Sequence, residues 1–426
     1  MPYSTPRNTL ITFVVILSIY FPSSLFAEES KPLSLKDCYF FALKQSETIA
    51  IQQQLIREAE GRFLQYIGNI FPQVSFESSD KWQNGPGNTS FTLREIPERK
   101  FVFSQPIFSG FKEIAAIKAS KIEEKQRQHE KRRAEQLLFI DVSDAFYFYI
   151  TYQENTATLQ EIRNALAERV TELKKREELG RSRQSEVAGA EAQLSRIEAE
   201  LDLITSDWEV ARQLLEFLTG QPIQALDDSL DTAGELTPME EYFEKSENRP
   251  DILAAKQAVA AAEKQMTVAR AGYWPTVKAD GNYYTKRVGN SANVDWDATL
   301  TVTMPISQGV STAGAVKQAD AQRQQAQLQL SQTERNAVLE IKNAYTRLQA
   351  ARRRTQFLQR ALDAAEKNYQ LQLSDYALNL VNNLVVLQAL EDLQEARRDF
   401  IIAKYDMKRA FSNFKVTIAE TPYDAS

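Results

Sequence analysis

Two long stretches of the chain carry apolar residues at alternating steps of four and three positions. The first series is Ala190, Leu194, Ile197, Leu201, Ile204, Trp208, Ala211, Leu215 and Leu218. The second is Ala389, Leu393, Ala396, Phe400, Ala403, Met407, Ala410 and Phe414, each 199 positions after a member of the first. A period of about 3.5 residues keeps one apolar seam on a partner helix and favours left-handed coiling. The pattern predicts two coiled-coil helices in one frame, and makes an ordinary amphipathic helix the weaker interpretation.

Shorter stretches alternate strictly between apolar and polar residues. The apolar members are Trp296, Ala298, Leu300, Val302, Met304 and Ile306, and the polar ones are Asp295, Asp297, Thr299, Thr301 and Thr303. A period of two is typical of a strand with one apolar face. Its partner strand begins with Val277, Ala279, Gly281 and Tyr283, which predicts a β-hairpin over about 276–306. In the first half the strands 73–81 and 91–103 are more weakly patterned and predict a hairpin over about 73–104.

The first 27 residues, 1–27, have the plan of a secretory signal peptide. Arg7 supplies a positive charge, Leu10–Phe21 is almost wholly apolar, and small Ala27 offers a cleavage site, although Leu25 is less typical at the −3 position. The apolar stretch is too short to span a bilayer as a helix. No apolar run of roughly 18 residues follows it. We therefore expect an exported protein that would enter a membrane by strands.

Each predicted strand has roughly 10 residues, the length that a tilted transmembrane β-strand needs. Hairpins of soluble proteins show the same pattern, so length alone leaves both interpretations open. The signal peptide and the Thr-rich polar face favour the membrane. On this interpretation Leu300 and Val302 face lipid.

Matching motifs indicate that the chain consists of two repeated halves. Residues 101–110, Phe-Val-Phe-Ser-Gln-Pro-Ile-Phe-Ser-Gly, match residues 300–309, Leu-Thr-Val-Thr-Met-Pro-Ile-Ser-Gln-Gly, at an offset of 199. Upstream, residues 71–74 (Phe-Pro-Gln-Val) match residues 274–277 (Trp-Pro-Thr-Val) at an offset of 203, which a short insertion or deletion between the motifs absorbs. The residues expected to turn each strand into the next helix are Pro106, Gly110, Pro305 and Gly309.

The spacing of proline predicts two long helical hairpins. No proline occurs between Pro106 and Pro222 or between Pro305 and Pro422, and both intervals are rich in Ala, Gln, Glu, Arg and Leu. This composition favours helices, which we expect as hairpins over 109–219 and 307–416.

Lengths then suggest how the helices combine into rods. The outgoing helix of the first hairpin would be about 105 Å long, and its return segment covers about half of that. We expect a helix over 251–273 to complete the first rod and the N-terminal segment 35–70 to complete the second. The chain would divide into a first repeat, 28–222, an equatorial linker, 223–247, and a second repeat, 248–426, which ends in a short tail.

Composition and charge exclude several functions. The formal net charge is −6, whereas a nucleic-acid-binding protein needs clustered positive charge. One cysteine, Cys38, and one histidine, His129, allow no intrachain disulfide and argue against a Cys/His metal site. His129 lies in a highly charged run, where a solvated helix residue is a better interpretation than a catalytic base. We expect no nucleic-acid partner, no enzyme activity, no cofactor and no metal.

The number of strands makes an oligomer necessary if they span a membrane. Four strands cannot close a barrel, and an open sheet edge is not tolerated in lipid. Copies of the chain must then pool their strands, which gives eight, twelve or sixteen for a dimer, trimer or tetramer. A barrel continued by helical rods is a tube, and a polar inner face makes the tube a conduit.

With these features together, the chain resembles the outer-membrane efflux proteins, the TolC-like outer-membrane factor family, over the whole mature sequence. The carriers are the junctions at 105–110 and 304–309, Asn248-Arg-Pro-Asp251 opening the second half, and the helical tips at 179–187 and 378–385. The resemblance implies a mainly α fold with a small membrane β part. It implies a long coiled-coil tunnel in the periplasm and four transmembrane strands per protomer, pooled by a homotrimer into a 12-stranded barrel in the outer membrane of a Gram-negative cell. The implied partners are outer-membrane lipid, a periplasmic adaptor (membrane fusion protein) and an inner-membrane transporter.

The helical tips hold the candidate functional residues. Gly180 and Asn379 lie where a long helix must reverse, and both residue types tolerate positive φ. In the family these turns close the tunnel and meet the adaptor, which by resemblance makes Gly180, Ser185, Glu186, Val187, Tyr376, Asn379 and Leu380 gate and docking candidates; the alternative is that they only form the turns. Well-known members place carboxylates at the narrowest ring, where this sequence has Val385 and Gln388. An acidic ring is expected only if Glu186 or Asp375 substitutes.

The leading hypothesis is a passive conduit of a tripartite efflux pump. The outer-membrane component of a type I protein secretion system is the alternative within the same class, because the inner-membrane partner mainly chooses the cargo. A periplasmic coiled-coil adaptor or scaffold is the alternative from another class. An adaptor should have one helical hairpin flanked by several β-rich segments, whereas two hairpins and four strands are predicted here.

Overall fold

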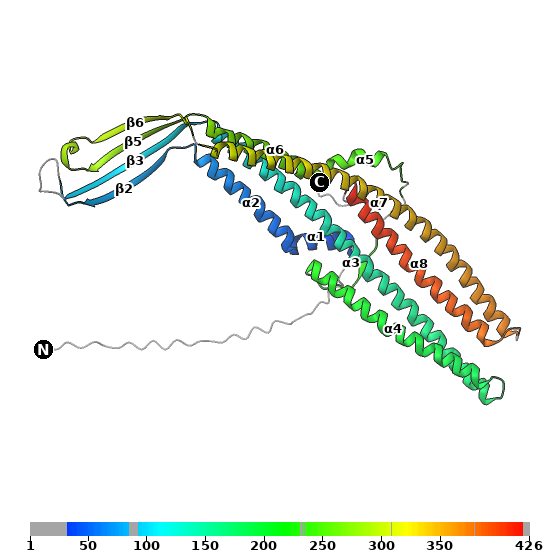
Figure 1. Cartoon of the computed structure of the whole chain (residues 1–426). Helices are drawn as coiled ribbons and strands as arrows, with labels where there is room; N and C mark the ends of the chain where they lie inside the picture. Colours follow the sequence, from blue (N-terminus) through cyan, green and yellow to red (C-terminus); the bar gives the residue numbers. More distant parts are fainter. Residues whose placement is uncertain are drawn as a thin grey trace, which may run out of the picture.

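The computed structural model describes residues 32–84, 93–230, 232, 234, 236–307, 309–378 and 380–420. The predicted signal peptide and Asn379 lie outside these residues. The molecule is elongated, with a four-stranded sheet at one end and long helices that run from it to the opposite end (Figure 1). Among the described helices, none is long and apolar enough to cross a membrane.

Both halves of the chain contain a helical segment, which is two helices in the first half, then two long strands, a long helix and a shorter helix, in that order. The first half has β1 (Leu33–Ser34), α1 (Leu35–Gln45), α2 (Glu47–Gly68), β2 (Gln73–Trp82), β3 (Glu95–Ser109), α3 (Lys112–Glu178) and α4 (Gln184–Thr219). The linker holds β4 (Leu226–Asp227), α5 (Glu241–Lys245) and the 3-10 turn Ser246–Asn248. The second half has α6 (Pro250–Arg270), the 3-10 turn Ala271–Tyr273, β5 (Thr276–Lys286), the 3-10 turn Gly289–Ser291, β6 (Trp296–Thr303), α7 (Ser311–Ala377) and α8 (Asn383–Thr417).

The long helices repeat almost residue for residue. α3 and α7 each have 67 residues, and α4 and α8 have 36 and 35. Seam residues such as Ala190, Leu215, Ala389 and Leu393 are buried, at 5% exposure or less. The helical hairpins expected from the shared period are therefore confirmed.

The four long strands form one antiparallel sheet in the order β2–β3–β5–β6. Both predicted bounds of the strand 91–103 are wrong, because β3 begins at Glu95 and continues to Ser109. Its pairing with β5 passes an irregularity between Pro106 and Phe108 and reaches Thr276 opposite Ser109. A bulge tolerates a proline, which cannot donate to the ladder, so Pro106 does not end the strand.

The expected helix starts at 109 and 307 are also early. α3 begins at Lys112 and α7 at Ser311. In the first half the strand uses the intervening residues. In the second half β6 ends at Thr303, and Pro305 and Gly309 precede the helix in an irregular segment.

The long helices form a single layer with two levels. Near the sheet the order is α2, α3, α6, α7, and toward the far end it is α4, α3, α8, α7 (Figure 1). The prediction that helix 251–273 continues the path of the first returning helix, and segment 35–70 that of the second, is therefore wrong. Instead α1 and α2 continue the path of α4 along α3, and α6 continues the path of α8 between α3 and α7. Helix lengths fit both arrangements equally well. The N-terminal segment is also two helices rather than one, because Ser46 breaks it and caps α2 by accepting a hydrogen bond from Ile49 N (3.4 Å).

Two joints at mid-length explain this arrangement. β1 pairs in parallel with β4, with Leu33 opposite Leu226, which holds the start of α1 to the chain that leaves α4. Arg249, directly before α6, donates from Nη1 to the carbonyl oxygen of Thr417 at the end of α8 (3.3 Å). Each shorter helix is thus continued by a helix whose first residues lie beside its last.

The best-buried core surrounds these joints. Phe139, Phe146 and Tyr147 of α3 are fully buried, and Tyr405 of α8 stacks on Tyr147 with 5.9 Å between ring centres. Arg249 is only 1% exposed, and its Nη2 lies 2.6 Å from Asp251 and 2.7 Å from Glu340. A buried charge is tolerated only with such partners. The joint of α6 and α8 is therefore held by ionic as well as apolar contacts.

Candidate functional site

The chain reverses at two equivalent tips. At the first tip Gly180 has φ +69°, the N–H of Arg181 donates to Arg176 O (2.7 Å) and the N–H of Gly180 donates to Glu177 O (2.8 Å). This pair of bonds ends a helix at a left-handed residue. At the second tip the N–H of Leu380 donates to Asp375 O (2.9 Å), 199 positions after the first bond. Asn379, which lies outside the described residues, holds the sequence position that corresponds to Gly180.

Ser185, Glu186 and Val187, in the first turn of α4, have three different settings. Glu186 caps the helix, because its Oε2 accepts hydrogen bonds from Ser182 Oγ (2.7 Å) and from the N–H of Arg183 (3.4 Å). Val187 is 6% exposed and packs between α3 and α4 with Val170, Leu173 and Ala190. Ser185 is exposed. Local structure therefore accounts for Glu186 and Val187, and only Ser185 presents its side chain freely.

Tyr376 joins the two tips. The guanidinium of Arg169 lies over its ring, 3.9 Å from the ring centre, and its hydroxyl accepts a hydrogen bond from Arg176 Nη1 (3.0 Å). Both arginines belong to α3, so this contact bridges the two helical hairpins. Glu172 binds both guanidinium groups, at 2.8 Å from Arg169 and 2.6 Å from Arg176. Arg169 Nε also donates to Oδ1 of buried Asn383 (2.9 Å). We call this group the Tyr376 clamp.

Only one member of the Tyr376 clamp could be predicted from the sequence. Tyr376 was a candidate, but its arginine partners were missed because they are 200 and more positions away and have no periodic or motif signal of their own. A cation stacked on an aromatic ring contributes about 0.5–2 kcal/mol, and its hydrogen bonds add to that. The clamp therefore adds a modest stabilisation to the contact between the two hairpins.

Exposed leucines lie at both tips. Leu179 at the first tip and Leu378, Leu380 and Leu384 at the second are 67–70% exposed. Val385 and Gln388 are exposed, Asp375 is half-buried, and Glu186 is engaged in its cap.

The strand-to-helix junctions differ in how tightly they are packed. Gly110 has φ +65°, and a Cβ on it would lie 2.7 Å from Trp274 Cβ and 2.8 Å from Ala271 O. Gly309 has φ +58° but open space around it. Pro106 lies at the irregularity in β3, and Pro305 follows the end of β6. Only the first junction therefore needs glycine for space as well as for its backbone angle.

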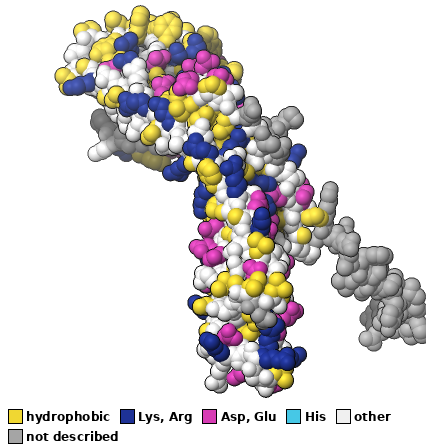
Figure 2. All heavy atoms as spheres, turned by 90° about the vertical axis from the view of Figure 1, so that its right-hand side faces the viewer, with side chains coloured by type: hydrophobic (Ala, Val, Ile, Leu, Met, Phe, Trp, Pro, Cys, Tyr) yellow, Lys and Arg dark blue, Asp and Glu magenta, His cyan; other side chains and the backbone are white. Residues whose placement is uncertain are grey.

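The strand register gives the sheet one apolar and one polar face. The apolar face carries Val74, Phe76, Phe101, Phe103, Tyr283, Trp296, Leu300 and Val302, which are 40–68% exposed. The polar face carries Asn282, Tyr284 and Asp297, and Asp297 accepts hydrogen bonds from the Asn282 amide (2.7 Å) and the Tyr284 hydroxyl (2.8 Å). Figure 2 shows hydrophobic side chains along the upper border of the sheet end, with charged side chains beside them and along the rods. An apolar face of this size marks a membrane or partner surface.

Aromatic residues border the apolar face at both ends. Phe76, Phe101, Tyr283 and Trp296 are successive register partners and form one row across all four strands. Phe71, Phe111, Tyr273 and Trp274, next to the helices, are 51–61% exposed. Aromatic belts of this kind lie at the two water interfaces of membrane β-proteins. The aromatic residues can be found in the sequence, but only the strand register shows that they form one row.

The described residues contain no group of three or more His, Cys, Asp or Glu side chains arranged to hold a metal ion. Cys38 is buried among apolar residues at the joint, and burial is the largest cause that raises the pKa of its thiol to about 12. His129 lies on α3, where burial and then the charge of Arg132 lower its pKa. These settings fit structural rather than catalytic side chains.

Fold and surface together define a class: a subunit with long helical rods and a small sheet whose apolar face needs a membrane or a partner. Comparison with known proteins identifies the family. The model of the outer membrane efflux protein family matches residues 41–221 and 244–416, one segment in each half. The chain belongs to this family. It is a TolC-type efflux protein of the outer membrane, and its family and fold are those of channel proteins and not of enzymes or periplasmic adaptors.

Relatives agree over most of the length. The outer membrane protein TolC of Vibrio cholerae serotype O1 is 23% identical over 322 residues, which cover 71% of this chain and 72% of TolC. The pyoverdine export outer membrane protein OpmQ of Pseudomonas putida is 22% identical over 374 residues, 84% of this chain and 79% of OpmQ. Among solved structures, VceC of Vibrio cholerae superposes with a TM-score of 0.80 at 20% identity, over 91% of this chain and 96% of VceC. CusC also gives 0.80, at 17% identity, over 90% and 91%.

Proposed function

We propose that three copies of the chain close into a channel, with a 12-stranded barrel in the outer membrane and a helical tunnel in the periplasm. The observation that carries the proposal is that the sheet and both levels of helices each end in unpaired elements along the same two edges of the subunit. The sheet ends in β2 and β6, the helices near the sheet end in α2 and α7, and those at the far end in α4 and α7. In Figure 1 β2, α2 and α4 run along one side, and β6 and α7 along the other.

These two edges complement each other. β2 and β6 run in opposite directions, since each neighbouring pair in the sheet is antiparallel, so β6 of one copy can pair with β2 of the next. Unlike edges that meet head to tail generate a closed ring when the rotation between copies closes, and an open filament when it does not. A barrel of about eight strands is filled by its own side chains, whereas a wider one leaves an aqueous lumen. Three copies, with 12 strands, therefore suit a conduit better than two.

Both helical edges carry an apolar stripe that the single chain leaves uncovered. On α4 the stripe is Leu203, Val210, Leu214 and Phe217, at steps of seven, four and three residues, and 46–75% exposed. On α7 it is Leu328, Leu339, Phe357 and Leu371, at steps of 11, 18 and 14 residues, and 54–72% exposed. At about 100° per residue, each set lies on one side of its helix. Packing these stripes between copies would remove them from water.

In this proposal the tips close the periplasmic end of the tunnel. Gly180, Ser185, Glu186 and Val187 of the first tip and Tyr376, Asn379 and Leu380 of the second form the gate region. The Tyr376 clamp holds the hairpins together in the closed state, and a periplasmic adaptor docks on the exposed leucines. An inner-membrane transporter supplies energy and cargo, and the channel conducts passively.

Native mass spectrometry of the detergent-extracted protein tests the assembly. The expected species is three mature chains, found in the outer-membrane fraction. Phe217→Lys on α4 or Phe357→Lys on α7 would place a charge in the contact between copies and should yield monomers. Leu137→Lys is the matched control, because Leu137 is 45% exposed on α3, which lies between other helices. A monomeric wild type, or trimers of both edge variants, would overturn the proposal.

A further inference from the structure

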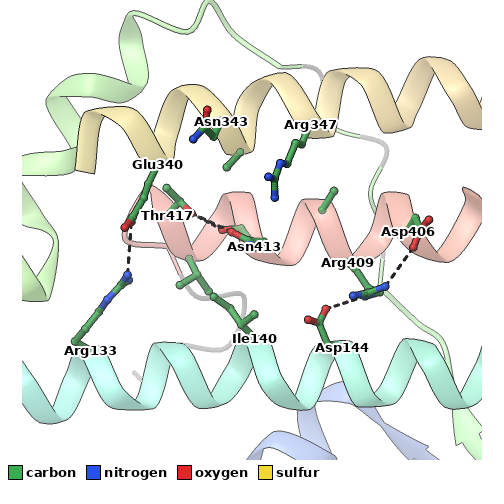
Figure 3. Close-up of a pocket in the computed structure, with 13 residues that line it drawn as sticks. Arg133, Ile140, Asp144, Glu340, Asn343, Arg347, Asp406, Arg409, Asn413 and Thr417 are labelled. Atoms are coloured by element: carbon green, nitrogen blue, oxygen red, sulfur yellow. Dashed lines mark hydrogen bonds and ion pairs between the residues drawn. The ribbon is translucent and has the colours of Figure 1, made fainter. Parts of the chain in front are cut away.

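A polar cavity of about 700 Å³ lies midway along the rods, between α3, α7 and α8 (Figure 3). Its charged lining residues are Arg133 and Asp144 of α3, Glu340 and Arg347 of α7, and Asp406 and Arg409 of α8. On α3 and α7 the two charged residues are 11 and seven positions apart, which places them on one side of the helix. The cavity is therefore built from one polar stripe of each of the three helices.

The carboxylates of the cavity already have partners. Arg409 lies 2.8 Å from Asp144 and 3.2 Å from Asp406. Glu340 is 2.7 Å from buried Arg249, which does not line the cavity. The negative charge of Glu340 is thus largely neutralised by Arg249, which lies outside the cavity.

Two arginines are left with little compensation. Arg133 is 3.7 Å from Glu340 and 3.8 Å from Asp251, longer than the bonds that Arg249 makes to the same carboxylates. Burial is the largest cause that lowers the pKa of Arg133, and the charge of Arg249 adds to it, against the opposing carboxylates. Arg347 has no hydrogen bond or ion pair within the described part of the chain, and Figure 3 shows it extending from α7 into the cavity. Added negative charge here would stabilise both groups.

A neutral donor lies beside them. Asn413 of α8 lines the cavity, and its Oδ1 accepts a hydrogen bond from Thr417 Oγ1 (3.2 Å). That bond leaves its amide nitrogen available. Guanidinium groups present planar pairs of N–H donors that match the oxygens of carboxylate, sulfate or phosphate.

The cavity and the linker lie on opposite sides of the layer formed by α3, α7 and α8. On α8, Lys408 binds Asp228 of the linker (2.6 Å), whereas Asn413, five residues and about 140° further round the helix, lines the cavity. On α7, Arg352 donates to Thr232 O of the linker (2.9 Å), and Arg347 is again five residues away. In the trimer proposed above, three linkers on the inner side would fill the tunnel. The linkers therefore lie outside, and the cavity opens to the lumen.

We propose that this cavity is a binding site on the tunnel wall for an anionic group of the transported molecule, held by Arg347 and Arg133 with Asn413. Three such sites form a ring at mid-length. The inference rests on the proposed trimeric conduit for its position in the lumen. Its ligand chemistry rests on the side chains alone.

Pyrophosphate is a suitable probe, and detergent-solubilised trimers in equilibrium dialysis give the direct measurement. Wild-type trimers should bind it saturably, and Arg347→Gln should weaken binding about tenfold, the loss expected for one charge-assisted contact. Arg353→Gln is the matched control, since it removes the same charge from the same helix and, within the described part of the chain, Arg353 bonds only to Gln349 (3.4 Å). It should bind like wild type. Absence of saturable binding, or equal loss in both variants, would overturn the site.

Conductance separates this site from the conduit itself. In planar bilayers, trimers opened by Tyr376→Ala should be blocked by pyrophosphate, and the block should need about tenfold more probe when Arg347→Gln is added. Normal conductance with a block unchanged by Arg347→Gln would overturn the lumen site and keep the channel. Binding in dialysis without any conductance would keep the anion site and overturn the conduit.

Discussion

The two halves of the molecule follow the same backbone path but are held by different contacts. α3 and α7 have the same length, and the N–H groups of Arg181 and Leu380 close the same type of helix end. Yet Tyr376 binds two arginines of α3, whereas Glu177, 199 positions earlier, makes no side-chain ion pair or hydrogen bond within the described residues. The duplicated backbone supplies the architecture. The link between the halves, the Tyr376 clamp, joins Tyr376 of the second tip to arginines of the first and has no counterpart at Glu177.

The strand-to-helix junctions should show the largest difference between the halves. Gly110→Ala combines a positive φ with overlaps on Trp274 and Ala271, so it should cost about 3 kcal/mol or more. Gly309→Ala meets the same kind of backbone angle in open space and should cost about 1 kcal/mol. Thermal unfolding of the two variants measures the difference. Equal melting temperatures would mean that the junctions are equivalent.

The two faces of the second hairpin offer the next comparison. Leu300→Lys places a charge on the apolar face, where it should cost about 2–4 kcal/mol in lipid and reduce the protein recovered from the outer membrane. Thr301→Lys, one residue along the same strand, places it on the polar face and should assemble normally. The reverse outcome would show that the apolar face lines the lumen.

Much of this comparison could be predicted from the sequence, because helix seams and strand alternation are local patterns. The offset of 199 placed Gly180 at the first tip, and the period of two placed Leu300 on the apolar face. Val187 could also have been assigned to the core, since it continues the seam that leads to Ala190 and Leu194. Which helix continues α4 and which continues α8 could not be foreseen, because this depends on Arg249 and Thr417 meeting across 168 positions. The same is true of the Tyr376 clamp and of the polar cavity.

Acid should separate the two mid-length joints. Burial by itself would raise the pKa of Asp251, but the hydrogen bonds and charge of Arg249, with Arg133, outweigh it and lower that pKa. A depressed carboxyl pKa adds stability that is present above the ordinary value of about 3.9 and is lost as pH falls below it. Hydrogen exchange below about pH 4 should therefore rise first at the α6–α8 joint, while the β1–β4 joint stays protected. Simultaneous loss of protection at both would contradict this assignment.

The helix caps of the two tips should differ least. Glu186→Ala and Asn382→Ala each remove a cap of the returning helix, and each should cost about 0.5–2 kcal/mol. Chemical denaturation should show similar losses, since the caps serve the same backbone with different side chains. A much larger loss for Glu186→Ala would indicate a role for Glu186 beyond capping.

The conductance of single trimers in planar bilayers tests the central claim most directly, that this subunit forms a conduit closed by the Tyr376 clamp, a link between its halves with no counterpart at Glu177. Wild-type trimers should be mostly closed, Tyr376→Ala should open them to a large and lasting conductance, and Glu177→Ala at the equivalent position should leave them closed. If Tyr376→Ala conducts no more than wild type, or if Glu177→Ala opens the channel equally, the Tyr376 clamp does not hold the gate.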